Sequence, residues 1–217
     1  MRQQRNYSAR PIIVALWSIV LIWLFVACDA GSGPSGGTAT PTPSPTPTPS
    51  PTPSPTPSPT SVPLVTYTGT GYTIGYPKGW QVTAGSDGYV SFSDPQGVAY
   101  LAIRMQPNPQ GALPPDKLVD AGLAVFQAQA TNYQRIAIAP TTTVAGETWS
   151  QGAATGDITP EGQNSPVTAK VIVLATNHPP SSLTTRGFTI AYGTAEQVFD
   201  QANSSAFQPM LQSFRFT

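Results

Sequence analysis

Short runs of alternating hydrophobic and polar residues dominate the C-terminal part of the chain. In the segment 71–77, Tyr72, Ile74 and Tyr76 alternate with small or polar residues, and Pro77 ends the run. Alternation with a period of two is typical of a β-strand that buries one face. The same pattern, or a longer apolar run between turn residues, predicts further strands at 80–84, 88–93, 98–106, 133–139, 148–156, 168–177 and 185–193.

A first helix is predicted over 114–130. Two prolines and Asp116 open the segment, and helix N-termini favour both residue types. Helical spacing then gives it a predicted buried face, formed by Val119, Gly122, Leu123, Phe126 and Ala130.

A second helix is predicted over 194–214, where Thr194 and Gln197 form a capping-box pattern. Its predicted buried face consists of Val198, Phe199, Ala202 and Ala206. Pro209 is expected to break or restart the helix, and a short strand at 213–216 follows. One helix between strands and one near the end predict an α+β fold, an antiparallel sheet flanked by helices.

The N-terminal segment 1–27 has the layout of an export signal. Arg2, Arg5 and Arg10 precede an apolar core that runs from residue 11 to 27, which favours translocation of everything that follows. Residues 24–28 resemble a bacterial lipobox. The resemblance implies cleavage between Ala27 and Cys28 and attachment of a diacylglycerol to the Cys28 sulfur. Phe25 departs from the usual Leu, Val or Ile. An uncleaved signal anchor with an incidental cysteine is the alternative interpretation.

Segment 28–63 carries proline at every second position from Pro41 to Pro59, alternating with Thr and Ser. Proline fixes φ and removes the amide donor, so neither helix nor sheet is expected. A disordered or polyproline II stalk remains, at about 3.1 Å per residue where extended. The stalk is either O-glycosylated or an unmodified linker. The remaining residues, 64–217, form the one globular domain.

Charge is sparse: 9% of residues are Asp, Glu, Lys or Arg. Without the three N-terminal arginines, 7 basic residues face 10 acidic ones, which leaves the mature chain at a net charge of −3. Nucleic acid is therefore not an expected partner, because phosphate binding needs clustered Lys and Arg.

The stretches "GYTIGYPKGW", "VSFSDP" and "MLQSFRF" look like the PsbP/Mog1-like family. In that family an aromatic-Pro-x-Gly-Trp turn joins the first two strands, which here corresponds to Tyr76, Pro77, Gly79 and Trp80. The resemblance implies an α/β/α sandwich, and members that are mostly accessory or binding proteins and include bacterial lipoproteins.

Candidate sites are few, and each has a structural alternative. Trp80 and Trp149 could line a ligand groove or pack in the core. His178 is expected to be an exposed turn residue without a catalytic partner. Asp157 and Glu161 share one loop and form at best a weak carboxylate pair.

The glycosylation sequon at Asn203 lies on a predicted helix and is discounted. Asp87 and Asp94 lie apart, so no calcium site is expected. No catalytic, metal or cofactor motif is recognised.

The predicted protein is thus a non-catalytic lipoprotein at the extracytoplasmic face of the cell membrane, held there by its lipid. Its domain would bind an envelope protein or a small ligand. A structural envelope protein is the first alternative, and a carboxylate-dependent hydrolase is the second.

The lipid anchor predicts a specific mass for protein extracted from the membrane fraction. Intact mass spectrometry should show a chain that starts at Cys28 and carries acyl groups. Such acyl groups would keep the chain in the membrane fraction, because each buried methylene adds about 0.8 kcal/mol to membrane binding. A Cys28→Ser variant should keep residues 1–27 and gain no acyl mass. A free thiol on the wild-type chain would contradict the lipid anchor.

Overall fold

The computed structural model describes residues 62–160 and 164–217. Its strands are β1 (Leu64–Gly69), β2 (Tyr72–Pro77), β3 (Gln81–Ala84), β4 (Tyr89–Ser93), β5 (Tyr100–Pro107), β6 (Thr131–Ile136), β7 (Thr141–Val144), β8 (Glu147–Ile158), β9 (Val167–His178), β10 (Arg186–Ala195) and β11 (Arg215–Phe216). Its helical elements are η1 (Pro109–Gly111), α1 (Pro115–Gln127), η2 (Glu196–Val198), α2 (Phe199–Ala202), η3 (Asn203–Phe207) and α3 (Gln208–Ser213). Every strand predicted from the alternating pattern is present, whereas β1 and β7 were not predicted.

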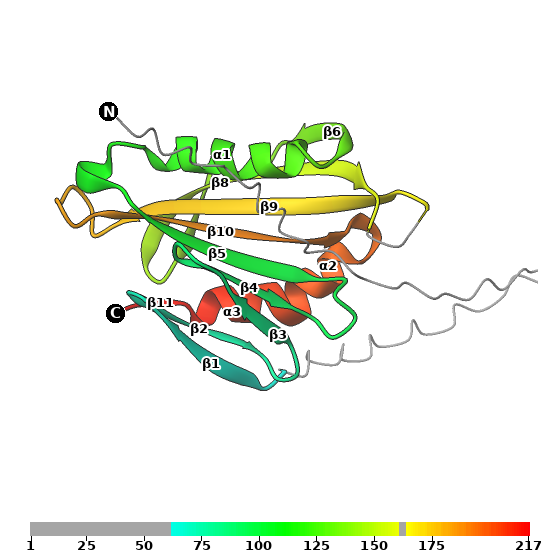
Figure 1. Cartoon of the computed structure of the whole chain (residues 1–217), viewed down its shortest axis with the longest axis horizontal. Helices are drawn as coiled ribbons and strands as arrows, with labels where there is room; N and C mark the ends of the chain where they lie inside the picture. The colour runs from blue at the N-terminus through cyan, green and yellow to red at the C-terminus, as the bar shows by residue number, and fades with distance from the viewer. Residues whose placement is uncertain (1–61, 161–163) are drawn as a thin grey trace, which may run out of the picture. The chain divides into compact units, whose positions relative to one another are not determined.

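The larger of two sheets has eight strands in the order β3-β4-β5-β10-β9-β8-β6, with β7 paired to β8. All its pairings are antiparallel, and β9 and β10 pair along their whole common length, from Ala169 to His178. Figure 1 shows α1 across one face of this sheet and α2 and α3 on the other. The predicted α+β class, an antiparallel sheet flanked by helices, is confirmed.

Helix α1 packs against β8 and β9 through the face that its spacing predicted. Val119, Leu123 and Phe126 are buried there, together with Leu118, while Ala130 lies beyond the helix end. Gly122 allows the close approach. A Cβ at this position would lie 2.7 Å from Cγ1 of Val173 on β9, so a larger residue would push the helix away from the sheet.

The opposite face of the sheet is covered by a second layer, which contains α2, η3, α3 and a three-stranded sheet ordered β1-β2-β11. The core between the eight-stranded sheet and this second layer is rich in aromatic rings. Trp149, Phe188, Phe207 and Phe214 are each at most 1% exposed. Large aromatic side chains contribute much of the burial energy in such a layer.

The C-terminal helical segment differs from its prediction. Thr194 belongs to β10, where it pairs with Lys170 of β9, and forms no helix cap. Its hydroxyl is buried without a hydrogen-bond partner within the described residues. Strand pairing outweighs the local capping pattern, so the capping-box prediction is wrong.

The predicted buried face of this segment is only partly present. Phe199 and Ala206 are buried, but Val198 is 40% exposed. A π-helical turn, η3, ends at Phe207, two residues before Pro209, whose missing amide hydrogen cannot bond to the carbonyl one α-helical turn earlier. Pro209 therefore changes the helix locally without ending it.

The turn after β2 contains the four residues on which the family resemblance rests. The Trp80 amide donates to the Pro77 carbonyl at 3.1 Å, which closes a four-residue turn. Gly79 has φ +96°, as the third position of a type II turn requires. Tyr76 packs on Phe92, with ring centroids 5.2 Å apart.

Within the described ranges, no helix is both long and apolar enough to cross a membrane. The proposed signal segment, Ala27, Cys28 and the stalk up to residue 61 lie outside these ranges.

We predict that Gly79→Ala lowers the free energy of unfolding by about 1–2 kcal/mol, the cost of holding an L-residue in the left-handed region. Apart from residues 78–80 themselves, no heavy atom lies within 4 Å of the added methyl group, so backbone strain alone accounts for the loss. Lys78→Ala, in the same exposed turn, is the matched control and should have little effect. Equal urea denaturation midpoints for the Gly79→Ala variant and the wild type would contradict the turn assignment.

Candidate functional site

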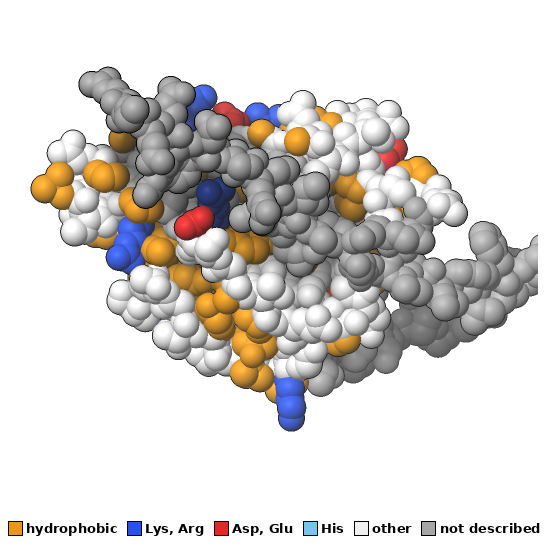
Figure 2. Space-filling model, viewed as in Figure 1, with side chains coloured by type: hydrophobic (Ala, Val, Ile, Leu, Met, Phe, Trp, Pro, Cys, Tyr) orange, Lys and Arg blue, Asp and Glu red, His pale blue; other side chains and the backbone are white. Residues whose placement is uncertain are grey.

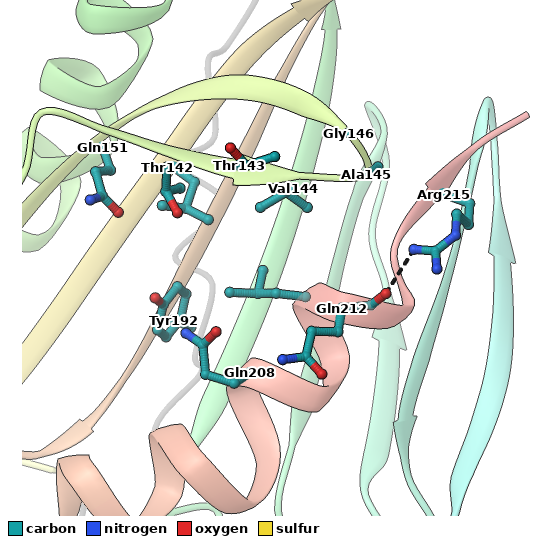
Figure 3. A pocket seen from close by; sticks show the side chains of 12 residues that line it. Thr142, Thr143, Val144, Ala145, Gly146, Gln151, Tyr192, Gln208, Gln212 and Arg215 are labelled. Carbon is teal, nitrogen blue, oxygen red and sulfur yellow. Dashed lines mark hydrogen bonds between the residues drawn. The ribbon is translucent and has the colours of Figure 1, made fainter.

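A pocket of about 510 Å³ lies between the β7–β8 hairpin and helix α3 (Figure 3). This volume falls within the range of small-molecule sites. Its lining residues are Thr142, Thr143, Val144, Ala145, Gly146, Gln151, Leu174, Tyr192, Gln208, Leu211, Gln212 and Arg215. They come from six elements, β7, β8, β9, β10, α3 and β11, and from the hairpin turn, so the pocket exists only in the folded domain.

The hairpin wall owes its shape to the Ala145–Gly146 turn. Both residues have positive φ, 54° and 78°, and Val144 pairs directly with Glu147. Two central residues with positive φ are typical of the type I′ turn, whose twist matches a tight hairpin. The turn places Thr142 and Thr143 along one side of the pocket (Figure 3).

Trp149 holds the β7–β8 hairpin in place from within the core. Its indole nitrogen donates to the Val144 carbonyl at 3.2 Å, and the side chain is completely buried. The ring stacks on Phe216 at 6.1 Å and meets the edge of Phe214 at 5.6 Å. Trp149 therefore fixes the hairpin to the C-terminal segment and does not line the pocket.

Helix α3 supplies the opposite wall through Gln208, Leu211 and Gln212, which share one helical face. Leu211 is buried, whereas the amide group of Gln208 lies next to Tyr192 in Figure 3. The Gln208 amide nitrogen lies 3.3 Å from Asn203 Oδ1, which orients that side chain.

Tyr192 is the most buried polar residue of the lining, at 3% exposure. It lies between Thr142 and Gln208 in Figure 3. Burial raises the pKa of Tyr192 to about 12, so its hydroxyl stays protonated at neutral pH. Among the described residues, the one fully buried side-chain polar atom without a partner is Thr194 Oγ1, so the Tyr192 oxygen keeps access to the pocket.

Two further polar side chains of the lining, Gln151 and Arg215, are held by backbone carbonyls. Gln151 Nε2 donates to the carbonyls of Ala139 and Thr141, at 2.8 and 3.2 Å. Arg215 Nη1 donates to the carbonyls of Gln212 and Phe214, at 2.7 and 2.6 Å. These bonds fix both side chains before any ligand arrives.

The pocket therefore combines amides, hydroxyls and one guanidinium over an apolar floor that includes Leu174 and Leu211. Its lining, as formed by the described part of the chain, has no histidine, cysteine or carboxylate, the groups that usually transfer protons or attack as nucleophiles. Nor do three His, Cys, Asp or Glu residues gather anywhere in 62–160 and 164–217 to hold a metal ion. Such a lining is suited to hydrogen-bonded recognition.

The structure places both candidate tryptophans outside this pocket. Trp80 is half-buried and contacts Phe207 edge-on, with ring centroids 6.3 Å apart. Trp149 lies in the core, as described above. The sequence does not reveal this pocket, because Gln208, Gln212 and Arg215 have no local pattern that marks them as pocket residues.

His178 was expected to lack a partner, and this expectation is wrong. It ends β9, and its Nδ1 lies 2.7 Å from Glu147 Oε1, 31 residues earlier in the chain. Its ring stacks on Phe216 at 3.8 Å. No local sequence signal links the two residues, because strand pairing across β8 and β9 brings them together. Neither residue lines the pocket.

Asp157 also differs from a catalytic carboxylate. It accepts hydrogen bonds from Asn132 Nδ2 and Thr168 Oγ1, each at 2.7 Å. These bonds, first that of Asn132, hold the pKa of Asp157 below its usual value, the opposite of what a general acid requires. Its proposed companion, Glu161, lies outside the described residues.

A comparison with known protein families and with curated protein sequences gives no match. Two solved structures show limited similarity. A crystal structure of a Bacteroides thetaiotaomicron protein has a TM-score of 0.41 at 9% identity, over 67% of this chain and 45% of that protein. LpqN, involved in cell envelope biogenesis of Mycobacterium tuberculosis, has a TM-score of 0.41 at 12% identity, over 71% of this chain and 90% of LpqN. The chain thus spans less than half of the Bacteroides protein.

The hydrogen bonds of Asp157 predict an acid-sensitive contribution to stability. Because its pKa is lower in the folded than in the unfolded state, the contribution is present above the unfolded value and is lost as the pH falls through the folded value. The melting temperature should therefore fall below about pH 4. Asp157→Asn should lower it at pH 7 and flatten this decrease.

The matched control is Asp200→Asn, whose side chain is 98% exposed, and it should leave the profile unchanged. If the melting temperature of Asp157→Asn depends on pH in the same way as that of the wild type, the assignment of these hydrogen bonds is wrong.

Proposed function

We propose that the protein is a lipoprotein of the extracytoplasmic membrane face, anchored through Cys28, whose C-terminal domain binds a polar ligand without transforming it. The order of charged head, apolar core, Cys28 and proline-alternating stalk supports the anchoring. The partner would be a small molecule or an exposed part of an envelope protein.

One observation carries the binding function. The Tyr192 hydroxyl, on a side chain 3% exposed, has no partner among the described residues and opens into a pocket of about 510 Å³. Because this oxygen is reached from the pocket and is not among the fully buried atoms that lack a partner, a bound acceptor would replace water at the hydroxyl. The neighbouring amides of Gln208 and Gln212 offer further donors and acceptors, as expected of a site that orients a polar molecule.

The absence of catalysis is part of the same proposal. Among the described residues, the pocket lining has no histidine, cysteine or carboxylate, and the His178–Glu147 pair lies outside it. A hydrolase dependent on carboxylates would need such groups around a shared ligand position. A purely structural role remains the alternative if the pocket binds nothing.

Membership of the PsbP/Mog1-like group also belongs to the proposal. Helices on both faces of an antiparallel sheet and the Tyr76-Pro77-Lys78-Gly79-Trp80 turn support it. Accessory and binding roles would then be the expected ones.

The test is isothermal titration of the full chain in detergent with a panel of monosaccharides, amino acids and short peptides. At least one compound should bind, and Tyr192→Phe should weaken its binding about tenfold, the effect of one well-formed hydrogen bond. Gln208→Leu should weaken it as well.

Tyr133→Phe is the control, because Tyr133 packs against Phe126 on the α1 side of the sheet. It should bind like the wild type. The proposal fails if no panel member binds, or if neither Tyr192→Phe nor Gln208→Leu changes the affinity. The structural role would then be favoured.

A further inference from the structure

Of the residues in 62–160 and 164–217 that line the pocket, Arg215 is the one with a charged side chain. It lies on β11 beside Gln212, and the dashed line in Figure 3 marks its bond to the Gln212 carbonyl. Both bonds to backbone carbonyls start from Nη1. A guanidinium has five N–H donors, so Nε and Nη2 keep three of them for another acceptor.

Among the described residues, no carboxylate forms an ion pair with this cation. The ion pairs of the described residues involve Lys117, Arg135, Lys170 and His178, and none involves Arg215. The pocket thus has one positive charge, a fixed orientation for it and no acid of its own. A planar guanidinium with free donors matches the two oxygens of a carboxylate.

The rest of the lining limits how much negative charge a ligand can carry. The other polar side chains are neutral amides and hydroxyls, from Thr142, Thr143, Gln151, Tyr192, Gln208 and Gln212. Over residues 64–217, 7 basic residues face 9 acidic ones, which leaves the domain weakly acidic. Where Figure 2 shows described residues, white and orange predominate and few side chains are charged. A ligand with several negative charges would find one positive charge in the pocket and would be repelled by the weakly acidic domain, so its binding is not favoured.

We propose, resting on the function proposed above, that the ligand carries one carboxylate, bound by Arg215, and an uncharged body rich in hydroxyl or amide groups. The body contacts Gln208, Gln212 and the Tyr192 hydroxyl. Sugar acids and peptide carboxyl termini both have this chemistry. The site recognises the combination of one negative charge and several neutral hydrogen-bonding groups.

The experiment compares two pairs of probes that differ in charge, by calorimetric titration of the full chain in detergent. The pairs are glucuronate with glucose, and N-acetyl-dialanine with its C-terminal amide. In at least one pair the acid should bind about tenfold or more tightly than its neutral counterpart, the effect of one charge-assisted hydrogen bond. Which pair shows the difference distinguishes a sugar acid from a peptide terminus.

Variants assign the preference to Arg215. Arg215→Gln should reduce acid binding to the level of the neutral probe, and Arg215→Lys should restore part of it by keeping the charge. Arg104→Gln is the control, because Arg104 is exposed on β5 and lies outside the lining. Should Arg215→Gln fail to fold, added salt must weaken binding of the acid to the wild type and leave the neutral probe unaffected.

This inference is overturned if the acid and neutral probes bind equally tightly. It is also overturned if Arg215→Gln binds the acid probe as tightly as the wild type does. If Tyr192→Phe still weakens binding in that case, the pocket function stands and only the charge preference is wrong. Binding of none of the four probes also overturns the inference, whereas the wider compound panel decides the proposed function separately.

Discussion

The packing of Trp149 against Phe214 and Phe216 holds together the two walls of the pocket. The hydrogen bond from Trp149 to Val144 fixes the β7–β8 hairpin, and its ring contacts fix the end of α3 and β11. His178 extends the same cluster by stacking on Phe216. The pocket is therefore built on a rigid aromatic core, although its own lining is polar.

The neutral hydrogen-bonding groups that line the pocket can orient a ligand, but they attract it only weakly from a distance. Gln151 and Arg215 are each fixed by two backbone carbonyls, so little side-chain entropy is lost when they meet a ligand. The charge-poor sequence has the same consequence for the whole domain. Long-range electrostatic steering is weak, and contacts within the pocket decide what binds.

Several elements were predictable because their information is local. The alternation around Tyr72, Ile74 and Tyr76 gave β2, and helical spacing gave the buried face of α1, including the close approach at Gly122. Thr194 shows the limit of local patterns. Its capping-box spacing was present, but pairing with β9 kept it in a strand. β7 was missed because four residues rich in threonine have no apolar alternation.

The sequence by itself determined the α+β class, the order of most strands and helices, and the sparse charge of the domain. These follow from side-chain periodicity and composition, which act over a few neighbouring residues. Only the tertiary structure decided that Arg215, Gln208 and Tyr192 share a pocket and that His178 meets Glu147. The reason is that antiparallel pairing and aromatic packing join segments tens of residues apart, and no local spacing encodes which polar side chains then face one another.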